Sequence, residues 1–243
     1  MQVPLRVVLP TYNEAGNLEP LVRAVLEHPW AGVVVVDDGS PDGTGDIADR
    51  LARETDRVEV IHRERKLGLG TAYKAGYRRA LELGAEYVMT MDCDFSHDPA
   101  ALPDFYRAAR ESDLVIGSRY LHGVSVVYWP MRRILLSWFA NRYVRAITGL
   151  RVTDCTSGYR LYRRELLEKV GLDAIRASGY SFLVEMACRA AWMGFRLSEV
   201  QIIFTERREG QSKMSKRDIL EATVTPWRLR AMRLLGQPRR VVT

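Results

Sequence analysis

Two aspartates separated by one residue follow directly on a short apolar stretch. Asp92 and Asp94 come after 87–91, Tyr-Val-Met-Thr-Met, and Ser96 lies two residues further on. Because side chains alternate along an extended backbone, we expect both carboxylates on one side of the chain. Oxygen ligands suit Mg²⁺ or Mn²⁺, and these ions take further ligands from phosphate and water. The pattern predicts a metal site at Asp92, Asp94 and Ser96; the alternative is that the aspartates only cap turns or helices.

A second acidic loop, 37–44, reads Asp-Asp-Gly-Ser-Pro-Asp-Gly-Thr and also follows an apolar stretch. Its carboxylates are suited to accept hydrogen bonds from a base or a ribose, and its composition is equally typical of a tight turn. Both interpretations are compatible if the turn holds Asp38 in place. The glycine-rich loop 66–71, Lys-Leu-Gly-Leu-Gly-Thr, lacks the full spacing of a phosphate-binding fingerprint.

Short β-branched stretches alternate with segments of helical period in the first half of the chain, which predicts a mainly parallel sheet flanked by helices. The expected strands are 6–10, 33–36, 58–62, 87–91 and 114–117, and the expected helices are 17–27, 44–54, 70–83 and 100–111. Ligands of such sheets bind beyond the carboxyl ends of the strands. We therefore expect the polar loops 10–14, 37–44, 66–71 and 92–97 to meet at one edge.

The second half has a different pattern. It predicts helices over 131–148, 160–170 and 181–193, a strand over 197–205 and a helical segment over 215–235 that Pro226 starts or kinks. We expect a catalytic domain over 1–210 and a loosely attached, basic amphipathic tail over 211–243 that lies at a membrane interface. Five apolar residues of 131–148 fall on one helical face, which predicts either membrane contact or core packing: Leu135, Leu136, Phe139, Tyr143 and Ile147.

The 243 residues carry a formal net charge of +6, and the basic excess lies after residue 119. Since those basic residues alternate with long apolar side chains, we expect an anionic membrane surface as a partner rather than nucleic acid. The chain has three cysteines, and no apolar stretch approaches the ~20 residues that a spanning helix needs, so we expect neither a leader nor a spanning helix. These features favour a peripheral protein at the cytoplasmic face of a membrane; oligomeric state is left open.

Seven ordered motifs together resemble glycosyltransferase family 2, and more narrowly the dolichol-phosphate mannosyltransferases, also called polyprenol monophosphomannose synthases. The motifs lie at 10–14, 36–44, 66–73, 91–94, 117–120 (Gly-Ser-Arg-Tyr), 156–160 (Thr-Ser-Gly-Tyr-Arg) and 207–213. The resemblance covers nearly the whole chain. It implies a GT-A-type nucleotide-diphospho-sugar transferase fold, GDP-mannose as donor, a polyprenyl (dolichyl) phosphate as acceptor, and Mg²⁺ or Mn²⁺ as cofactor.

The resemblance also implies roles for individual residues. Asp94 and the residue at 96 would bind the metal, although Ser96 stands where the family more often has glutamine. Arg133 would lie on the acceptor side, and Arg119 and Arg207 would reach the acceptor phosphate. The catalytic set is Asp94, Arg119, Arg207 and Lys213. The implied donor-binding residues are Pro10, Tyr12, Glu14, Val36, Asp38, Asp92, Cys93, Asp94, Arg119, Arg207 and Lys213.

A lipid phosphate is already an anion at neutral pH, so this chemistry requires no catalytic base. We expect a single displacement with inversion, and we interpret Cys93 as a small spacer rather than a nucleophile. Two other functions remain open: a UDP-glucose-dependent polyprenyl-phosphate glucosyltransferase, and a non-catalytic nucleotide- or nucleic-acid-binding module that would give no reason for Asp92 and Asp94.

Overall fold

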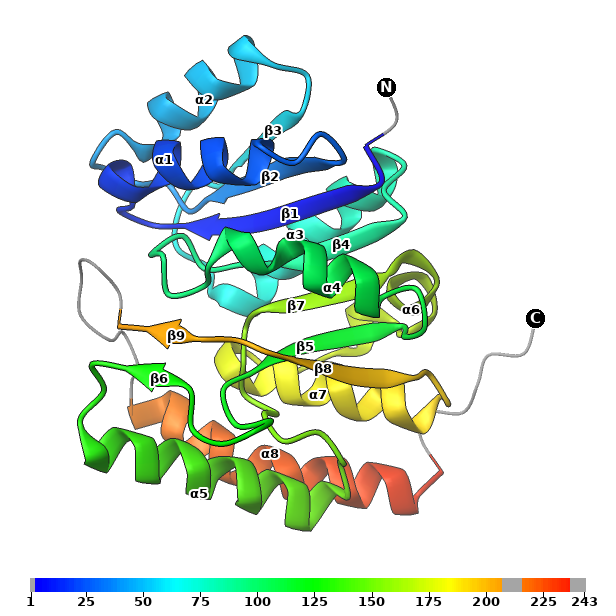
Figure 1. Ribbon diagram of the computed structural model, residues 1–243. Coiled ribbons are helices and arrows are strands. Elements are labelled where there is room, and N and C mark those ends of the chain that lie inside the picture. The colour runs from blue at the N-terminus through cyan, green and yellow to red at the C-terminus, as the bar shows by residue number, and fades with distance from the viewer. Residues whose placement is uncertain (1–2, 207–215, 237–243) are drawn as a thin grey trace.

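The computed structural model describes residues 3–206 and 216–236, whose secondary structure is dominated by one sheet of seven strands. The strand order is β3-β2-β1-β4-β7-β5-β8 (Figure 1). The strands are β1 (Leu5–Thr11), β2 (Ala31–Asp37), β3 (Val58–His62), β4 (Tyr87–Thr90), β5 (Leu114–Ser118), β7 (Arg160–Arg163) and β8 (Leu197–Gln201). All neighbours pair in parallel except β7, which is antiparallel to both β4 and β5. The predicted mainly parallel sheet is confirmed.

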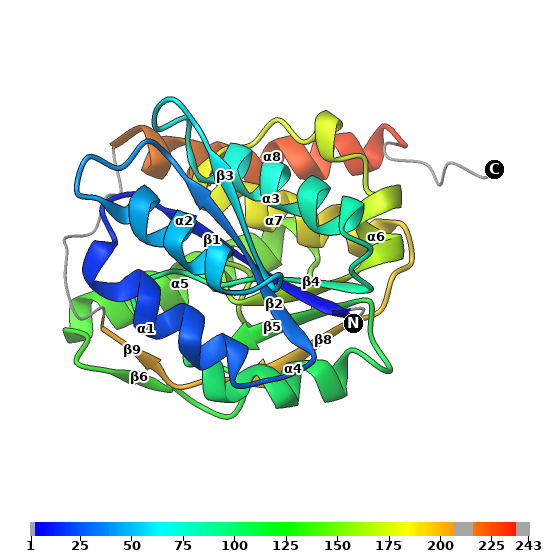
Figure 2. The same ribbon diagram turned by 90° about the horizontal axis from the view of Figure 1, so that it is seen from above.

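Helices cover both faces of this sheet (Figure 2). The helices are α1 (Ala15–Leu26), α2 (Thr44–Glu54), α3 (Leu69–Glu82), α4 (Leu102–Ala108), α5 (Met131–Thr148), α6 (Arg164–Lys169), α7 (Gly179–Trp192) and α8 (Lys216–Leu234), with 3-10 turns at Pro99–Ala101 and Leu172–Ala174. Alternate strand residues enter two separate cores: Val7 packs with the α1, α2 and α4 side, whereas Val8 packs with α3 and α7. Gly76 allows α3 to approach β1, since a Cβ there would lie 2.3 Å from a Val8 methyl.

Two predictions in the second half were wrong. Residues 160–163 were expected in a helix, but they form β7, and the helix begins only at Arg164. Leu161 and Tyr162 enter opposite cores, so the sheet position between β4 and β5 outweighs local helical preference. The expected single strand 197–205 is two: β8, and β9 (Phe204–Thr205), which pairs with β6 (Val126–Val127) in a small second sheet.

Helix α5 spans the predicted residues and ends at Gly149, whose φ of 76° suits the left-handed conformation that terminates helices. Its apolar face is divided between the two predicted roles. Leu135, Leu136 and Phe139 are exposed, whereas Ile147 is buried. Core packing therefore accounts for the second half of the helix, and the first half carries unburied apolar side chains.

Helix α8 lies beside α5 at the bottom of the molecule in Figure 1 and is packed on the domain. Leu229 is fully buried, Arg228 pairs with the buried Glu185 of α7 at 2.8 Å, and the indole of Trp227 donates to the Tyr143 hydroxyl at 2.9 Å. The expected loose attachment of this segment is therefore wrong for 216–236, and Pro226 lies inside the helix. No helix in the described ranges has the length and apolar character needed to span a bilayer.

Candidate active site

The loops expected to hold a nucleotide meet at the carboxyl edge of the first strands. The Glu14 backbone amide donates to Thr44 Oγ1 at 2.9 Å, which joins loop 10–14 to loop 37–44. The Lys66 ammonium lies 4.9 Å from the centre of the Tyr12 ring, within cation–π range, so loop 66–71 reaches the same place. The predicted convergence is thus confirmed for three of the four loops.

Within loop 37–44 the two aspartates have different partners. Asp37 holds the turn, because it accepts hydrogen bonds from Ser40 Oγ at 2.6 Å and from Thr11 Oγ1 at 3.0 Å. Asp38 instead accepts from Arg63 Nε at 2.6 Å. Burial raises the pKa of Asp38, although Arg63 opposes that shift. The turn thus leaves Asp38 as a carboxylate bound to Arg63, which lies outside all of the motifs.

Two further residues that were predicted to bind the sugar donor are less exposed. The Val36 side chain is fully buried in the core beside α3, away from the surface of these loops. Pro10 is half-buried near the end of β1. Any contact between Val36 and a nucleoside would therefore come through its backbone.

The acidic loop differs from its expected geometry. Strand β4 ends at Thr90, and Cys93 and Asp94 lie in a turn, so strand alternation does not describe their directions. Asp94 is 5% exposed, and its Oδ1 accepts hydrogen bonds from the Ser96 amide at 3.0 Å and the Ser96 hydroxyl at 2.6 Å. Phe95 between them has a φ of 59°, which is rare for a residue with a side chain. Ser96 therefore orients Asp94 as well as lying beside it.

His97 is buried behind this loop and was not selected from the sequence. Its Nδ1 accepts the Asp92 backbone N–H at 3.0 Å, and its ring stacks on Tyr159 with centroids 4.7 Å apart. Burial lowers the pKa of His97, which keeps the ring neutral. A neutral ring whose Nδ1 accepts carries its hydrogen on Nε2. His97 thereby holds the backbone of Asp92.

The oxygen-rich loop fits a hard divalent cation. Its carboxylates and hydroxyl, from Asp92, Asp94 and Ser96, are the donor types that Mg²⁺ and Mn²⁺ prefer. Over 3–206 and 216–236, no group of three or more His, Cys, Asp or Glu side chains is placed to hold a metal. A cation held here would take its remaining ligands from phosphate and water. Burial raises the pKa of Cys93 well above its usual range, which favours a thiol spacer over a nucleophile.

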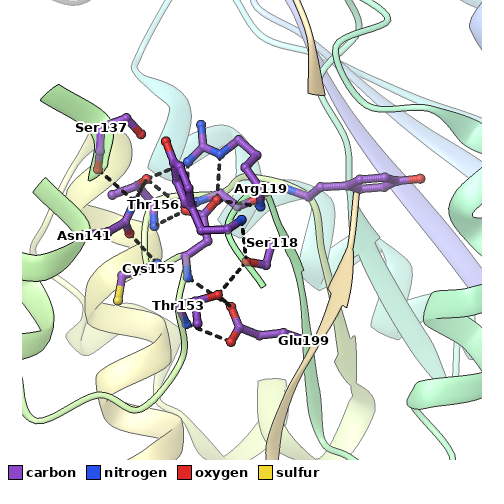
Figure 3. A network of polar contacts seen from close by, with 12 residues as sticks. Ser118, Arg119, Ser137, Asn141, Thr153, Cys155, Thr156 and Glu199 are labelled. Atoms are coloured by element: carbon purple, nitrogen blue, oxygen red, sulfur yellow. Dashed lines mark hydrogen bonds and ion pairs between the residues drawn. The ribbon is translucent and has the colours of Figure 1, made fainter. Parts of the chain in front are cut away.

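Arg119 follows β5 and is bound to a buried aspartate (Figure 3). Its Nε donates to Asp154 Oδ2 at 2.6 Å, and its Nη2 donates to Asp154 Oδ1 and to Thr156 Oγ1, both at 2.8 Å. Asp154 is completely buried. Burial by itself raises its pKa, but Arg119 and the hydrogen bonds outweigh burial and hold the pKa below its usual value. The Arg119–Asp154 pair is therefore ionised.

The segment that holds Arg119 also contacts the acidic loop. A Cβ added at Gly158 would lie 3.7 Å from Asp92 Oδ1 and 3.6 Å from His97 Cε1. The Phe204 ring lies edge-on to His97 with centroids 5.7 Å apart, and the Arg119 guanidinium lies 5.4 Å from the Phe204 centroid. The structure thus brings the predicted metal loop and the predicted phosphate arginine into one site.

Arg133 extends this site from the first turn of α5. Its guanidinium lies 4.0 Å from the Trp129 ring centroid and pairs with the Glu206 carboxylate at 2.6 Å. Arg119 lies 5.5 Å from the centre of the same indole. Trp129 therefore contacts two of the three arginines that were assigned to the acceptor, Arg119 and Arg133. Arg207 and Lys213 lie outside the described residues.

The sheet is mostly parallel, and the loops 10–14, 37–44 and 66–71 and the acidic loop lie at its carboxyl edge. With the family match, this arrangement defines a glycosyltransferase with a GT-A-type fold. The chain belongs to glycosyl transferase family 2, whose sequence profile matches residues 6–171. The resemblance drawn from the ordered motifs is confirmed.

Two curated relatives match over most of their length. The undecaprenyl-phosphate mannosyltransferase of Micrococcus luteus is 48% identical over 228 residues, which is 92% of this chain and 93% of the relative. The polyprenol monophosphomannose synthase of Mycolicibacterium smegmatis is 48% identical over 230 residues, which is 92% of this chain and 86% of the relative. Both are similar to this chain in sequence and in extent.

Two solved structures share the fold. Glucosyl-3-phosphoglycerate synthase from Mycobacterium tuberculosis, in complex with Mn²⁺, UDP-glucose and phosphoglyceric acid, has a TM-score of 0.64 at 19% identity and covers 97% of this chain and 80% of that one. A mannosyltransferase from Pyrobaculum calidifontis, in complex with GDP-Man and Mn²⁺, has a TM-score of 0.56 at 19% identity and covers 96% and 74%. At these identities the likeness shows the fold alone.

Proposed function

We propose that this protein transfers mannose from GDP-mannose to a polyprenyl phosphate and forms a polyprenyl β-mannosyl phosphate. The observation that carries the proposal is the 48% identity to two polyprenyl-phosphate mannosyltransferases across 92% of the chain. The arrangement of the site supports it, because an acidic loop suited to a cation that binds a diphosphate lies next to arginines suited to a second phosphate.

On the donor side, loops 10–14 and 37–44 would hold the guanosine. Asp38 supplies a buried carboxylate for hydrogen bonds to the base or ribose, and Arg63 keeps it oriented. Tyr12 and Glu14 lie on the adjoining loop, where contacts with loops 66–71 and 37–44 fix the backbone. Rigid placement of the donor lowers the entropy that must be lost in the transition state.

The donor diphosphate would lie at the acidic loop. Asp92 and Asp94 would hold a divalent cation, with Ser96 as a further oxygen or as the group that orients Asp94. When bound, such a cation stabilises the negative charge that develops on a departing diphosphate. His97, itself buried behind the loop, holds Asp92 through its backbone amide.

On the acceptor side, Arg119 and Arg133 would bind the lipid phosphate. Arginine presents a planar fork that matches phosphate oxygens, and two such groups offset the repulsion between two anionic substrates. One phosphate oxygen forms a bond to the anomeric carbon while the bond from that carbon to GDP breaks, and its electron pair leaves with GDP. Attack from the opposite side inverts the α-linked donor into a β-linked product.

The experiment that tests this function is a transfer assay with the purified full-length chain. Labelled GDP-mannose, a polyprenyl phosphate and Mg²⁺ or Mn²⁺ are expected to yield lipid-extractable mannose in β linkage. UDP-glucose in a parallel reaction is the control for donor choice. A preference for UDP-glucose, an α-linked product or a covalent mannosyl-enzyme intermediate would contradict the proposal.

We also propose that the first half of α5 contacts the membrane that contains the acceptor. The exposed side chains there form what we call the α5 apolar surface: Met131, Leu135, Leu136, Trp138 and Phe139. Leu136 is 70% exposed and Phe139 61%, and Arg142 lies over the Trp138 ring at 5.0 Å. Apolar side chains bordered by arginine are typical of helices at an anionic lipid interface.

Replacing Leu136 and Phe139 together with aspartate is expected to reduce binding to vesicles that contain anionic lipid by about tenfold, because each change removes apolar burial and adds repulsion. Flotation of the full-length protein measures this. The matched control is Leu67→Asp, an exposed leucine on the loop after β3. The double variant Leu234→Asp, Leu235→Asp tests the end of α8 in the same way. If it loses as much vesicle binding as the α5 double variant, both helices contact the membrane.

A further inference from the structure

The loop that holds Arg119 is itself held from two sides. This loop, 153–157, is the middle of the connection 149–159 between α5 and β7, and its backbone makes no strand or helix. From β8, Glu199 accepts the backbone amides of Thr153 at 2.7 Å and of Asp154 at 3.0 Å. From α5, Asn141 accepts the Cys155 amide at 2.7 Å (Figure 3). Each contact satisfies a backbone amide that is not hydrogen-bonded within a helix or strand.

Asn141 is the link between this loop and the lipid side of the molecule. It is 3% exposed, and its amide nitrogen donates to the Ser137 carbonyl of α5 at 3.0 Å and to Thr156 Oγ1 at 3.4 Å. The same Thr156 hydroxyl oxygen accepts from Arg119. One buried side chain on α5 thus contacts two consecutive residues, Cys155 and Thr156, in the segment that orients the Arg119 guanidinium.

The remaining orientation of Arg119 comes from Asp154. That carboxylate also accepts the backbone amides of Thr156 and Ser157, at 3.2 and 3.1 Å, so its position depends on the conformation of the whole loop. If the loop moves, the two Asp154 carboxylate oxygens move with it. The Arg119 guanidinium then moves as well, because it is hydrogen-bonded to both oxygens. Displacements of about 1 Å at a reacting group lower rates by about 100-fold.

We propose that Asn141 is a positioning residue for the acceptor phosphate and acts through the 153–157 loop on Arg119. The proposal rests on the proposed function, in which Arg119 binds that phosphate. The exposed half of the same helix carries the α5 apolar surface. Asn141 therefore joins the helix that carries the α5 apolar surface to the loop that orients the Arg119 guanidinium.

A purely structural role for Asn141 predicts a different pattern. Loss of a buried amide would then lower the stability of the whole domain and weaken donor and acceptor use alike. A positioning role predicts a change confined to the acceptor, and it predicts that the change vanishes once Arg119 has been removed. Non-additivity of this kind identifies residues that act through one another.

The experiment is a double-mutant cycle on the full-length protein with Asn141→Ala, Arg119→Ala and the double variant. Asn141→Ala is expected to lower kcat/KM for polyprenyl phosphate by about 10- to 100-fold and to change the KM for GDP-mannose by less than about twofold. In the Arg119→Ala background the same substitution is expected to have little further effect. Thr148→Val is the matched control, since Thr148 is another buried polar side chain of α5. Its hydroxyl donates to the Val144 carbonyl at 2.7 Å and accepts the Leu150 amide at 3.4 Å, and neither of these partners belongs to the 153–157 loop.

Additive losses in the cycle, or parallel losses for both substrates, would overturn the proposal. Thermal unfolding of each variant identifies a loss that comes from a damaged fold, which also counts against it. Failure of the proposed function has a separate signature: the unmodified protein would transfer no mannose, or Arg119→Ala alone would leave acceptor use unchanged.

Discussion

Replacing Asp94 with alanine is expected to lower kcat for mannose transfer by about 100- to 1,000-fold, because one preorganised group that stabilises developing charge contributes about that much. Asp94 is 5% exposed and held by two hydrogen bonds from Ser96, so its carboxylate is fixed before the substrate arrives. Steady-state rates over a series of Mn²⁺ concentrations measure the effect. We expect a higher metal requirement as well as a lower maximal rate.

Asp98→Ala is the control for this substitution. Asp98 lies four residues further along and is exposed, and its carboxylate caps a short helix by accepting the Ala100 amide at 2.9 Å. It therefore tests whether a disturbance nearby in the loop is enough to reduce the rate. Undiminished turnover of Asp94→Ala, or of the unmodified protein in excess chelator, would contradict the role assigned to Asp94.

Replacing Asp154 with alanine is expected to destabilise the protein by about 3–5 kcal/mol, because it leaves the buried Arg119 without its counter-charge. Asp154 is 0% exposed and accepts from the Arg119 side chain and from three backbone amides. Urea unfolding measures the change. Asp173→Ala removes the partner of Arg78 at the surface, where Asp173 is 88% exposed, and is expected to change stability by about 0–1 kcal/mol. If the two substitutions lowered the free energy of unfolding equally, the claim that burial makes the Asp154–Arg119 pair important would be contradicted.

The stability that Asp154 contributes should depend on pH in a definite direction. Its pKa in the folded state is lowered, since Arg119 and the hydrogen bonds outweigh burial. The contribution is therefore fully present above the unfolded pKa of about 3.9 and is lost as pH falls through the lower folded value. We expect the free energy of unfolding of the unmodified protein to exceed that of Asp154→Asn by a constant amount between about pH 5 and pH 7. Urea unfolding at several pH values in this range measures the difference. The advantage should shrink below about pH 4.

The sequence predicted the elements with strong local patterns. The helices 44–54 and 131–148 have the predicted bounds, and all five strands of the first half are present. β7 was missed because Arg-Leu-Tyr-Arg has no distinctive strand pattern, and only the places beside β4 and β5 make it a strand. Helix α8 reads as a basic tail by composition, and its packing against α7 depends on contacts far away in the chain.

The same limit applies to the site. The motifs located Asp92, Asp94 and Arg119, and the structure brings their loops together. The partner of Arg119 could not be predicted, because Asp154 lies 35 residues away and no periodicity joins them. Asn141 belongs to none of the seven motifs, so nothing in the local sequence selects it. Its contact with Cys155 shows why a buried amide belongs there.

The position of β7 has a consequence for how the protein is made. Strands β4 and β5 flank β7, which is formed by residues 160–163, so neither has its inner neighbour until that segment has been synthesised. A nascent chain that has just completed β5 presents one unpaired edge on β4 and two on β5, since β8 is also still missing, and such edges are sites of aggregation. We expect truncated chains that end before residue 160 to be insoluble and the nascent protein to depend on chaperones until β7 inserts.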